Sequence, residues 1–175
     1  MSAIDRRVAI GVVVAAALGA GGYFVFRPTD ESQIRAALAK LVAAVQIKEA
    51  DAQANPIGRL AHLSGVFETL FEPDVRVNIP ELTPLQSGRT ELVQMVVAAP
   101  RFVRTLEVDL GMVTVKLDEA AASAEVGAVA DVKAVDRDGT ARRDKRAVDF
   151  HFVKKDGGWI ITTLSVWSKD DAAPQ

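Results

Sequence analysis

A stretch of 19 uncharged residues near the start of the chain limits its fold more than any other feature. It runs from Val8 to Phe26 and has no polar face, which argues against a helix buried in the core of a soluble domain. As a helix it would extend roughly 28 Å, close to the hydrocarbon thickness of a bilayer. Arg6 and Arg7 precede it, and Tyr23 begins an aromatic cluster at its far end. The stretch therefore predicts a single transmembrane helix.

The charges on either side of this helix predict its orientation. Two arginines and the amino terminus precede it, whereas Arg27 is followed by Asp30 and Glu31. By the positive-inside rule the N-terminus stays in the cytoplasm and the remainder is exported. A cleaved signal peptide is the alternative, because Ala17-Leu18-Gly19 is an acceptable cleavage site. We expect a cytoplasmic segment at 1–7, the membrane helix at 8–26, a linker at 27–31, an extracytoplasmic domain at 32–168 and a flexible tail at 169–175.

Composition narrows the chemistry of the remaining chain. At 175 residues there is room for one ordinary domain besides the anchor. The net charge of −2 argues against bulk binding to nucleic acid. Because the chain has no cysteine, disulfides, thiolate metal sites and cysteine nucleophiles are excluded.

Two helices are predicted directly after the linker. Asp30 is placed to cap the first, with Gln33 as its capping-box partner. Asn55-Pro56 is a suitable start for the second. Apolar residues recur at helical spacing in both. The first helix should bury Ile34, Leu38, Leu41 and Val45, and the second Ile57, Leu60, Phe67, Leu70 and Phe71.

Beyond Pro73 the apolar pattern changes from helical to alternating. Val75, Val77 and Ile79 predict a half-buried strand, and a loop with Pro80, Pro84 and Gly88 follows. A short helix is expected at 90–97, before Pro100. Four further strands are expected at 102–117, 122–135, 140–154 and 159–168. The order of elements indicates an α+β fold.

The parity of the apolar residues predicts the register of the last hairpins. Even-numbered positions carry the apolar side chains in the last three strands, so each turn must contain an odd number of residues. Three-residue loops at Arg137-Asp138-Gly139 and Asp156-Gly157-Gly158 meet this requirement. Val126, Phe150 and Leu164 should then lie side by side, as should Ala128, Val148 and Val166.

Two short motifs within this order of elements suggest a family. Ser87-Gly88-Arg89 enters the third helix, and residues 155–160 (KDGGWI) precede the last strand. Over residues 32–168 the chain resembles the nuclear transport factor 2-like superfamily, whose cone-shaped fold also occurs in ketosteroid isomerase and polyketide cyclases. The resemblance implies two to three helices packed on a curved antiparallel sheet of four to five strands. Members include enzymes, ligand-binding modules and assembly domains, so fold alone does not define function. In layout the chain is similar to membrane-anchored members in type IV secretion systems and in mycobacterial lipid-import complexes.

Residues that could carry catalysis are few. The isomerases of this superfamily use a tyrosine in their oxyanion hole, and the only tyrosine here, Tyr23, lies in the membrane segment. Neither a metal-ligand spacing nor a phosphate-binding loop is found, so we expect no cofactor and no metal. The predicted register places His151 beside Glu125, with Asp149 two residues away. These residues could form an acid–base pair, or they could be a solvated outer sheet face.

Other residues could form a partner surface. Trp159 and Trp167 fall on the same odd-numbered face as Thr163, and large exposed aromatic side chains often mark interfaces. His62 is expected on the surface of the second helix. The basic run at 142–146 is interpreted as a solvated strand end, with anionic lipid or protein contact as the alternative.

Two functional hypotheses follow. The first is a membrane-tethered, non-enzymatic interaction, assembly or ligand-binding domain of a bacterial cell-envelope complex. Its expected partners are the membrane, another protein or a second copy, and a small apolar ligand, but no nucleic acid. The second is a cyclase or isomerase that uses Asp149 and His151, which requires an enclosed pocket around them.

Overall fold

The computed structural model describes residues 28–49, 51, 56–79 and 88–168. The predicted membrane boundaries Val8 and Phe26, the cap at Asn55, the loop prolines Pro80 and Pro84, and the C-terminal tail lie outside these residues. Within the described ranges, no helix has the length and apolar character needed to cross a membrane. Except for the first turn of its first helix, the described fold lies within one compact unit, Gln33–Gln175.

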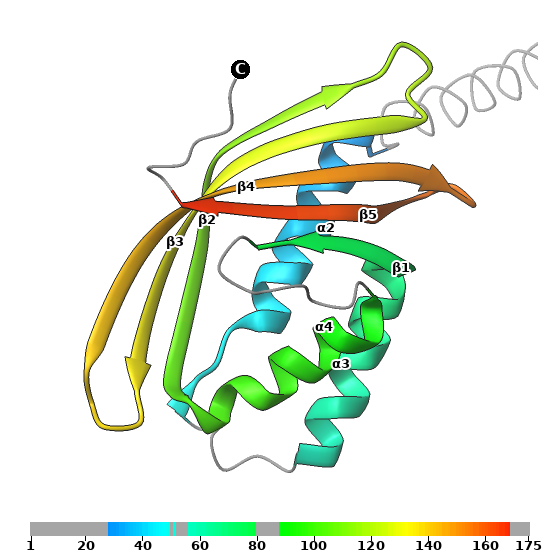
Figure 1. Ribbon diagram of the computed structural model, residues 1–175. Coiled ribbons are helices and arrows are strands. Elements are labelled where there is room, and N and C mark those ends of the chain that lie inside the picture. The colour runs from blue at the N-terminus through cyan, green and yellow to red at the C-terminus, as the bar shows by residue number, and fades with distance from the viewer. Residues whose placement is uncertain (1–27, 50, 52–55, 80–87, 169–175) are drawn as a thin grey trace, which may run out of the picture. The chain divides into compact units, whose positions relative to one another are not determined.

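Three α-helices, one short 3-10 helix and five strands make up the described fold (Figure 1). The helices precede most of the sheet in the chain, as expected for an α+β fold. In order, the elements are α2 (Asp30–Val45), α3 (Pro56–Leu70), β1 (Phe71–Asn78), α4 (Arg89–Ala98), η2 (Ala99–Arg101), β2 (Val103–Leu117), β3 (Ser123–Asp136), β4 (Ala141–Lys155) and β5 (Gly158–Ser168).

Small differences from the sequence predictions occur at the helices. Thr29, rather than Asp30, caps α2, because its Oγ1 accepts a hydrogen bond from the backbone N–H of Ser32. In α3 the predicted burial of Ile57 and Leu60 is wrong, since they are 76% and 43% exposed. The buried side chains of α3 lie in the part that leads into β1: Leu63, Phe67 and Leu70.

The sheet has the strand order β1-β5-β4-β3-β2. Three of its four pairings are antiparallel, but β1 runs parallel to β5, so the prediction of a wholly antiparallel sheet is wrong. The reason is the connection through α4 and η2, which carries the chain from one edge of the sheet to the other. Arg89 helps fix this crossover, because its Nη1 donates a hydrogen bond to the carbonyl of Phe71 at 3.2 Å.

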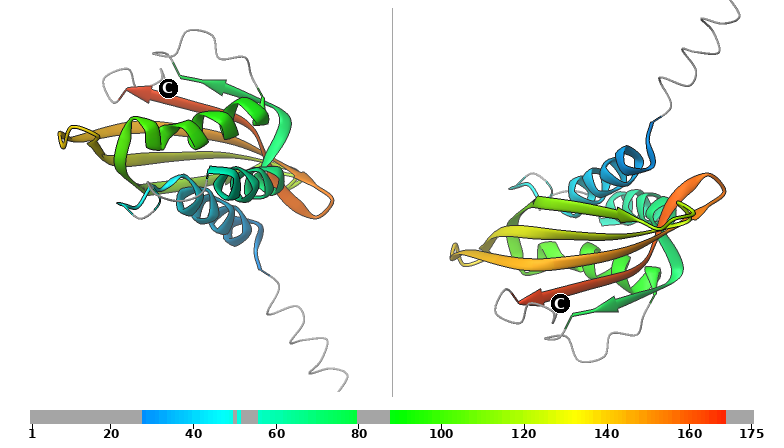
Figure 2. Two further views of the ribbon diagram at one scale, coloured as in Figure 1. Left: turned by 90° about the horizontal axis from the view of Figure 1, so that it is seen from below. Right: turned by 90° about the horizontal axis from the view of Figure 1, so that it is seen from above.

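The core lies between the helices and one face of the sheet. Figure 2 shows that the helices leave the opposite face of β3, β4 and β5 uncovered. The predicted cross-strand neighbours are confirmed: Val126 pairs with Phe150, which pairs with Leu164. The core-facing side chains of β3 and β4 are the even-numbered ones: Ala124, Val126, Ala128, Ala130, Val148, Phe150 and Phe152.

The two hairpins that end the sheet differ from each other. Between β3 and β4 the predicted three-residue loop is confirmed, with Asp136 and Thr140 hydrogen-bonded across it and Gly139 at φ +91°. Between β4 and β5 the turn has only two residues, Asp156 and Gly157, both with positive φ, so a three-residue loop there is wrong. This is the geometry of a type I′ turn, whose twist matches that of the flanking strands.

A β-bulge in β5 compensates for the shorter turn. His151 pairs with Thr163 but Phe152 pairs with Ile161, which leaves Thr162 as an extra residue. The bulge reverses the alternation in the first part of β5. Consequently Trp159 lies in the core at 5% exposure and Ile160 is only half-buried, so the predicted outward position of Trp159 is wrong.

Candidate functional site

The space enclosed by helices and sheet is filled with apolar side chains. Phe67 and Phe71 have their ring centroids 5.1 Å apart, and those of Phe150 and Phe152 are 6.1 Å apart. Among the described residues no polar or charged residue is buried as a whole, although Nε and Nη2 of Arg59 in α3 are buried without a hydrogen-bond partner. No three acidic or histidine side chains in this part of the chain cluster as metal ligands. The described interior is therefore mainly apolar, with the Arg59 guanidinium, whose Nη1 lies 4.0 Å from Oδ2 of Asp51, as an exception.

The candidate residues His151 and Glu125 instead meet on the outer face of the sheet. Glu125 of β3 pairs with His151 of β4, and their side chains approach to 2.6 Å between Nδ1 and Oε1. Both remain accessible, with 36% of the His151 side chain and 67% of the Glu125 side chain exposed. Thr163 of β5 flanks His151 on the other side, as predicted. Glu125 and His151 are therefore within hydrogen-bonding distance, and solvent reaches both side chains.

Asp149 and Trp167 form a second contact on this face. The indole Nε1 of Trp167 donates a hydrogen bond to Oδ2 of Asp149 at 3.1 Å. The other carboxylate oxygen, Oδ1, lies 3.6 Å from where a Cβ on Gly127 would be. Oδ2 of Asp149 therefore accepts the indole hydrogen bond, while Oδ1 lies over Gly127 of β3, which has no side chain.

A shallow hollow of about 310 Å³ surrounds this glycine. Its walls come from three strands and carry charges of both signs. They include Thr114 and Lys116 of β2, Glu125 of β3 and Asp149 of β4. Trp167 does not line the hollow but is hydrogen-bonded to Asp149 in its wall. A polar, charged rim next to an aromatic side chain is typical of protein-binding surfaces rather than of enclosed reaction sites.

The sequence did not reveal Thr114 and Lys116 as part of this surface. In β2 a bulge between Gly111 and Thr114 changes the parity, so that these even-numbered residues face outward. The bulge residue Met112 has φ +51°, which side chains of its type rarely adopt. Gly111, directly before Met112, is the sequence signal for this irregularity, because an isolated glycine inside a strand often marks a bulge.

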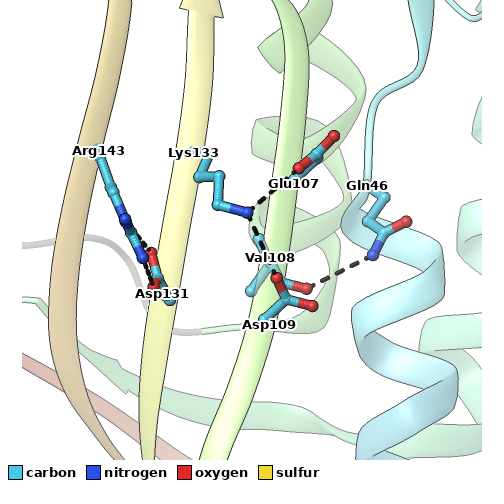
Figure 3. Close-up of polar contacts among 7 residues, drawn as sticks. All are labelled: Gln46, Glu107, Val108, Asp109, Asp131, Lys133 and Arg143. Atoms are coloured by element: carbon cyan, nitrogen blue, oxygen red, sulfur yellow. Dashed lines mark hydrogen bonds and ion pairs between the residues drawn. The ribbon is translucent and has the colours of Figure 1, made fainter.

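The basic run at the start of β4 is largely neutralised by acidic neighbours. Arg143 donates two hydrogen bonds to Asp131 (Figure 3), while Arg142 and Arg146 form ion pairs with Asp136 and Asp144 at 2.7 and 2.6 Å. The Arg143 guanidinium holds the pKa of the Asp131 carboxyl below its ordinary value of 3.8, and Asp131 in turn raises the pKa of Arg143. This supports the interpretation of a solvated strand end. His62 is exposed on α3, as expected.

Solved structures with the same fold have diverse roles. An NTF2-like superfamily protein from Salmonella enterica is 13% identical, with a TM-score of 0.60, and the match covers 79% of this chain and 90% of that one. A candidate calcium/calmodulin-dependent protein kinase II association domain from Xanthomonas campestris is 18% identical (TM-score 0.59; 81% and 89% covered). A candidate NTF2-like dehydratase from Streptomyces avermitilis is 15% identical (TM-score 0.60; 80% and 97% covered).

At these identities the likeness establishes the fold alone, and the named neighbours include both an association domain and an enzyme class. No curated protein matches the sequence. Residues 62–165, which span α3 to β5, match the SnoaL-like domain. The chain therefore belongs to the SnoaL-like family, and its fold is similar to that of the NTF2-like protein from Salmonella enterica.

Proposed function

We propose that this chain is a membrane-tethered, non-enzymatic docking domain of a cell-envelope complex. In this proposal Val8–Phe26 anchors the chain, and the SnoaL-like domain lies outside the cytoplasm. A protein partner binds the outer face of the sheet around Trp167, Asp149 and the hollow over Gly127.

The observation that carries the proposal is the separation of the two sheet faces. The inner face is packed with aromatic and aliphatic side chains, whereas the outer face presents the polar groups. The hydrogen bond that Trp167 donates to Asp149 orients the indole ring before a partner binds. A pre-oriented aromatic side chain loses little conformational entropy on binding, which is why tryptophan is frequent among interface hot spots.

An enzymatic role is the second candidate, and the Glu125–His151 contact favours it. A histidine hydrogen-bonded to a carboxylate can exchange protons with a substrate. However, a cyclase or isomerase reaction needs a site that excludes water, and the side chains of Glu125 and His151 are both solvent-accessible. A structure with a similar fold is described as a candidate dehydratase, which is consistent with the enzymatic alternative.

The anchor is tested by labelling single cysteines in intact cells. The chain contains no cysteine, so Ser2→Cys and Ser64→Cys each provide one unique thiol. We expect a membrane-impermeant maleimide to label Ser64→Cys in α3 but not Ser2→Cys, with the protein recovered in the membrane fraction. Labelling of Ser2→Cys alone, or recovery in the soluble fraction, would contradict the proposed topology.

Docking is tested by the size of the complex released from membranes in mild detergent. His151→Ala and Trp167→Ala remove side chains from the outer face. His62→Ala is a matched control, because it removes the only other histidine, which is exposed on α3. We expect native electrophoresis to show a smaller species for the two sheet variants and an unchanged one for His62→Ala. The docking proposal fails if all three variants migrate like the parent protein.

A further inference from the structure

A second surface of the domain lies between α2 and the edge strand β2. It is a groove of about 400 Å³, within the typical range of ligand pockets, roughly 300–1,000 Å³. It lies apart from the outer-face residues discussed above. Its apolar lining consists of Leu38, Ala39, Val42, Ala43, Leu110 and Val113.

The groove exists because α2 is attached to β2 at its two ends. At one end Arg35 donates from Nη2 to the carbonyl of Val113 at 3.1 Å. At the other end Gln46 donates from Nε2 to the carbonyl of Val108 at 3.4 Å (Figure 3). Ile47 then pairs with the edge of β2, exchanging backbone hydrogen bonds with Leu106.

Small side chains keep the middle of the groove open. Ala39 and Ala43 lie one helical turn apart and are both exposed. On the opposite wall, the bulge at Met112 turns the carbonyl of Val113 toward Arg35. From Arg35 to Gln46 the helix rises roughly 16 Å, which sets the length of the apolar floor.

The two ends of the groove differ in charge. Arg35 lies at the end near Val113, and a guanidinium has five N–H donors, so it can bind a carboxylate in addition to its existing partners. Asp109 lies near the other end, where Nζ of Lys133 is 4.0 Å from its Oδ2 (Figure 3). An anionic group is therefore favoured at the Arg35 end and disfavoured at the Asp109 end, and the lining between them is apolar.

We propose that this groove binds a single-chain fatty carboxylate. The carboxylate lies at Arg35, and the alkyl chain runs along Ala39 and Ala43 toward Gln46. Burial of the alkyl chain against the apolar lining supplies affinity, and the charge-assisted hydrogen bond at Arg35 fixes the direction of the ligand. The site goes beyond the proposed docking function, because it uses a different surface of the domain.

The test uses the full chain in nanodiscs of uncharged lipid and a dodecanoate probe with a diazirine at the end of its chain. After photolysis, mass spectrometry identifies the labelled peptides. We expect labelling within residues 35–47 and 106–115. Ala39→Leu and Ala43→Leu fill the groove and should reduce this labelling roughly tenfold, whereas Ala36→Leu, exposed on the same helix outside the groove, should not change it.

Competition separates the headgroup from the chain. Unlabelled dodecanoate should displace the probe roughly tenfold better than dodecanol, as expected for one charge-assisted hydrogen bond, and Arg35→Gln should abolish that preference. The proposed binding site would be overturned if the probe labelled the whole domain, or if labelling of the groove were unchanged in both Ala39→Leu and Ala43→Leu. Equal competition by dodecanol would overturn the carboxylate. Circular dichroism checks that each variant is folded. The docking assay on His151→Ala tests the outer sheet face, so its outcome is independent of the outcome at the groove.

Discussion

The register of β5 makes a sharp prediction about two adjacent residues. Replacing Trp159 by alanine removes a side chain that is only 5% exposed. A buried aromatic side chain of this size covers about 150–250 Å², which at about 25 cal/mol per Å² corresponds to roughly 4–6 kcal/mol as an upper bound. Measured losses for such truncations are about 3–5 kcal/mol, so we expect Trp159→Ala to lower the free energy of unfolding by about that amount.

Ile160→Ala is the matched control. Its side chain is half-buried on the opposite face, and we expect a loss of about 1 kcal/mol. Urea unfolding of residues 28–175, which keep all of α2 and its cap at Thr29, is followed by circular dichroism and compares the two variants. With strict alternation and no bulge at Thr162, the order would be reversed. A larger loss for Ile160→Ala than for Trp159→Ala would therefore refute the described register.

Fluorescence tests the same register without truncating the core. The chain has only two tryptophans, so Trp167→Phe leaves Trp159 as the single reporter and Trp159→Phe leaves Trp167. We expect Trp159 to emit at shorter wavelength and to resist quenching by iodide, whereas Trp167 should be quenched. Equal quenching of the two would contradict the burial of Trp159.

Three further predictions concern turns and charge pairs. Ala121 has φ +48°, so Ala121→Gly should raise the free energy of unfolding by about 0.5 kcal/mol, because relief of a left-handed alanine exceeds the added entropy of the unfolded chain. Gly157→Ala, at φ +81°, should lower it by about 1 kcal/mol, and thermal unfolding of both variants checks the opposite signs. The lowered pKa of Asp131 means that its contribution to stability is present above its ordinary value of 3.8 and is lost as the pH falls through the lower folded-state pKa. The stability difference between the parent and Asp131→Asn, measured by urea unfolding across pH, should therefore shrink on acidification, and a difference that grows would contradict the Arg143–Asp131 contact.

Much of the fold could be predicted from the sequence because alternation and helical spacing report directly on burial. Alternation of apolar and polar residues along each strand predicts where the strands from Val103 onward lie. Together with the turn lengths, it also predicts which residues pair: Val126 with Phe150, and Glu125 with His151. The first strand was also found, but its pairing with β5 was not. Which edge of the sheet a strand joins depends on how α4 crosses the core, and apolar periodicity does not encode that path.

The errors in the candidate site arise from irregular backbone. The sequence Asp156-Gly157-Gly158 fits either a two-residue or a three-residue turn, and the structure combines the shorter turn with a bulge at Thr162. That bulge moves Trp159 away from the predicted partner surface. A second bulge at Met112 brings Lys116 onto the outer face. The bulge at Thr162 has no glycine beside it, so the sequence carried no signal for it. At Met112 there was one, because Gly111 precedes it and the apolar residues change from even to odd positions there.

Site-specific photo-crosslinking tests most directly whether the outer sheet face is where a partner binds. In the full chain in native membranes, p-benzoylphenylalanine replaces either Lys116, on the rim of the hollow over Gly127, or Ser64, exposed on α3. The account predicts a discrete protein adduct from position 116 that disappears in the Trp167→Ala background, and none from position 64. An adduct from position 64 alone, or adducts from both positions that are unaffected by Trp167→Ala, would contradict it.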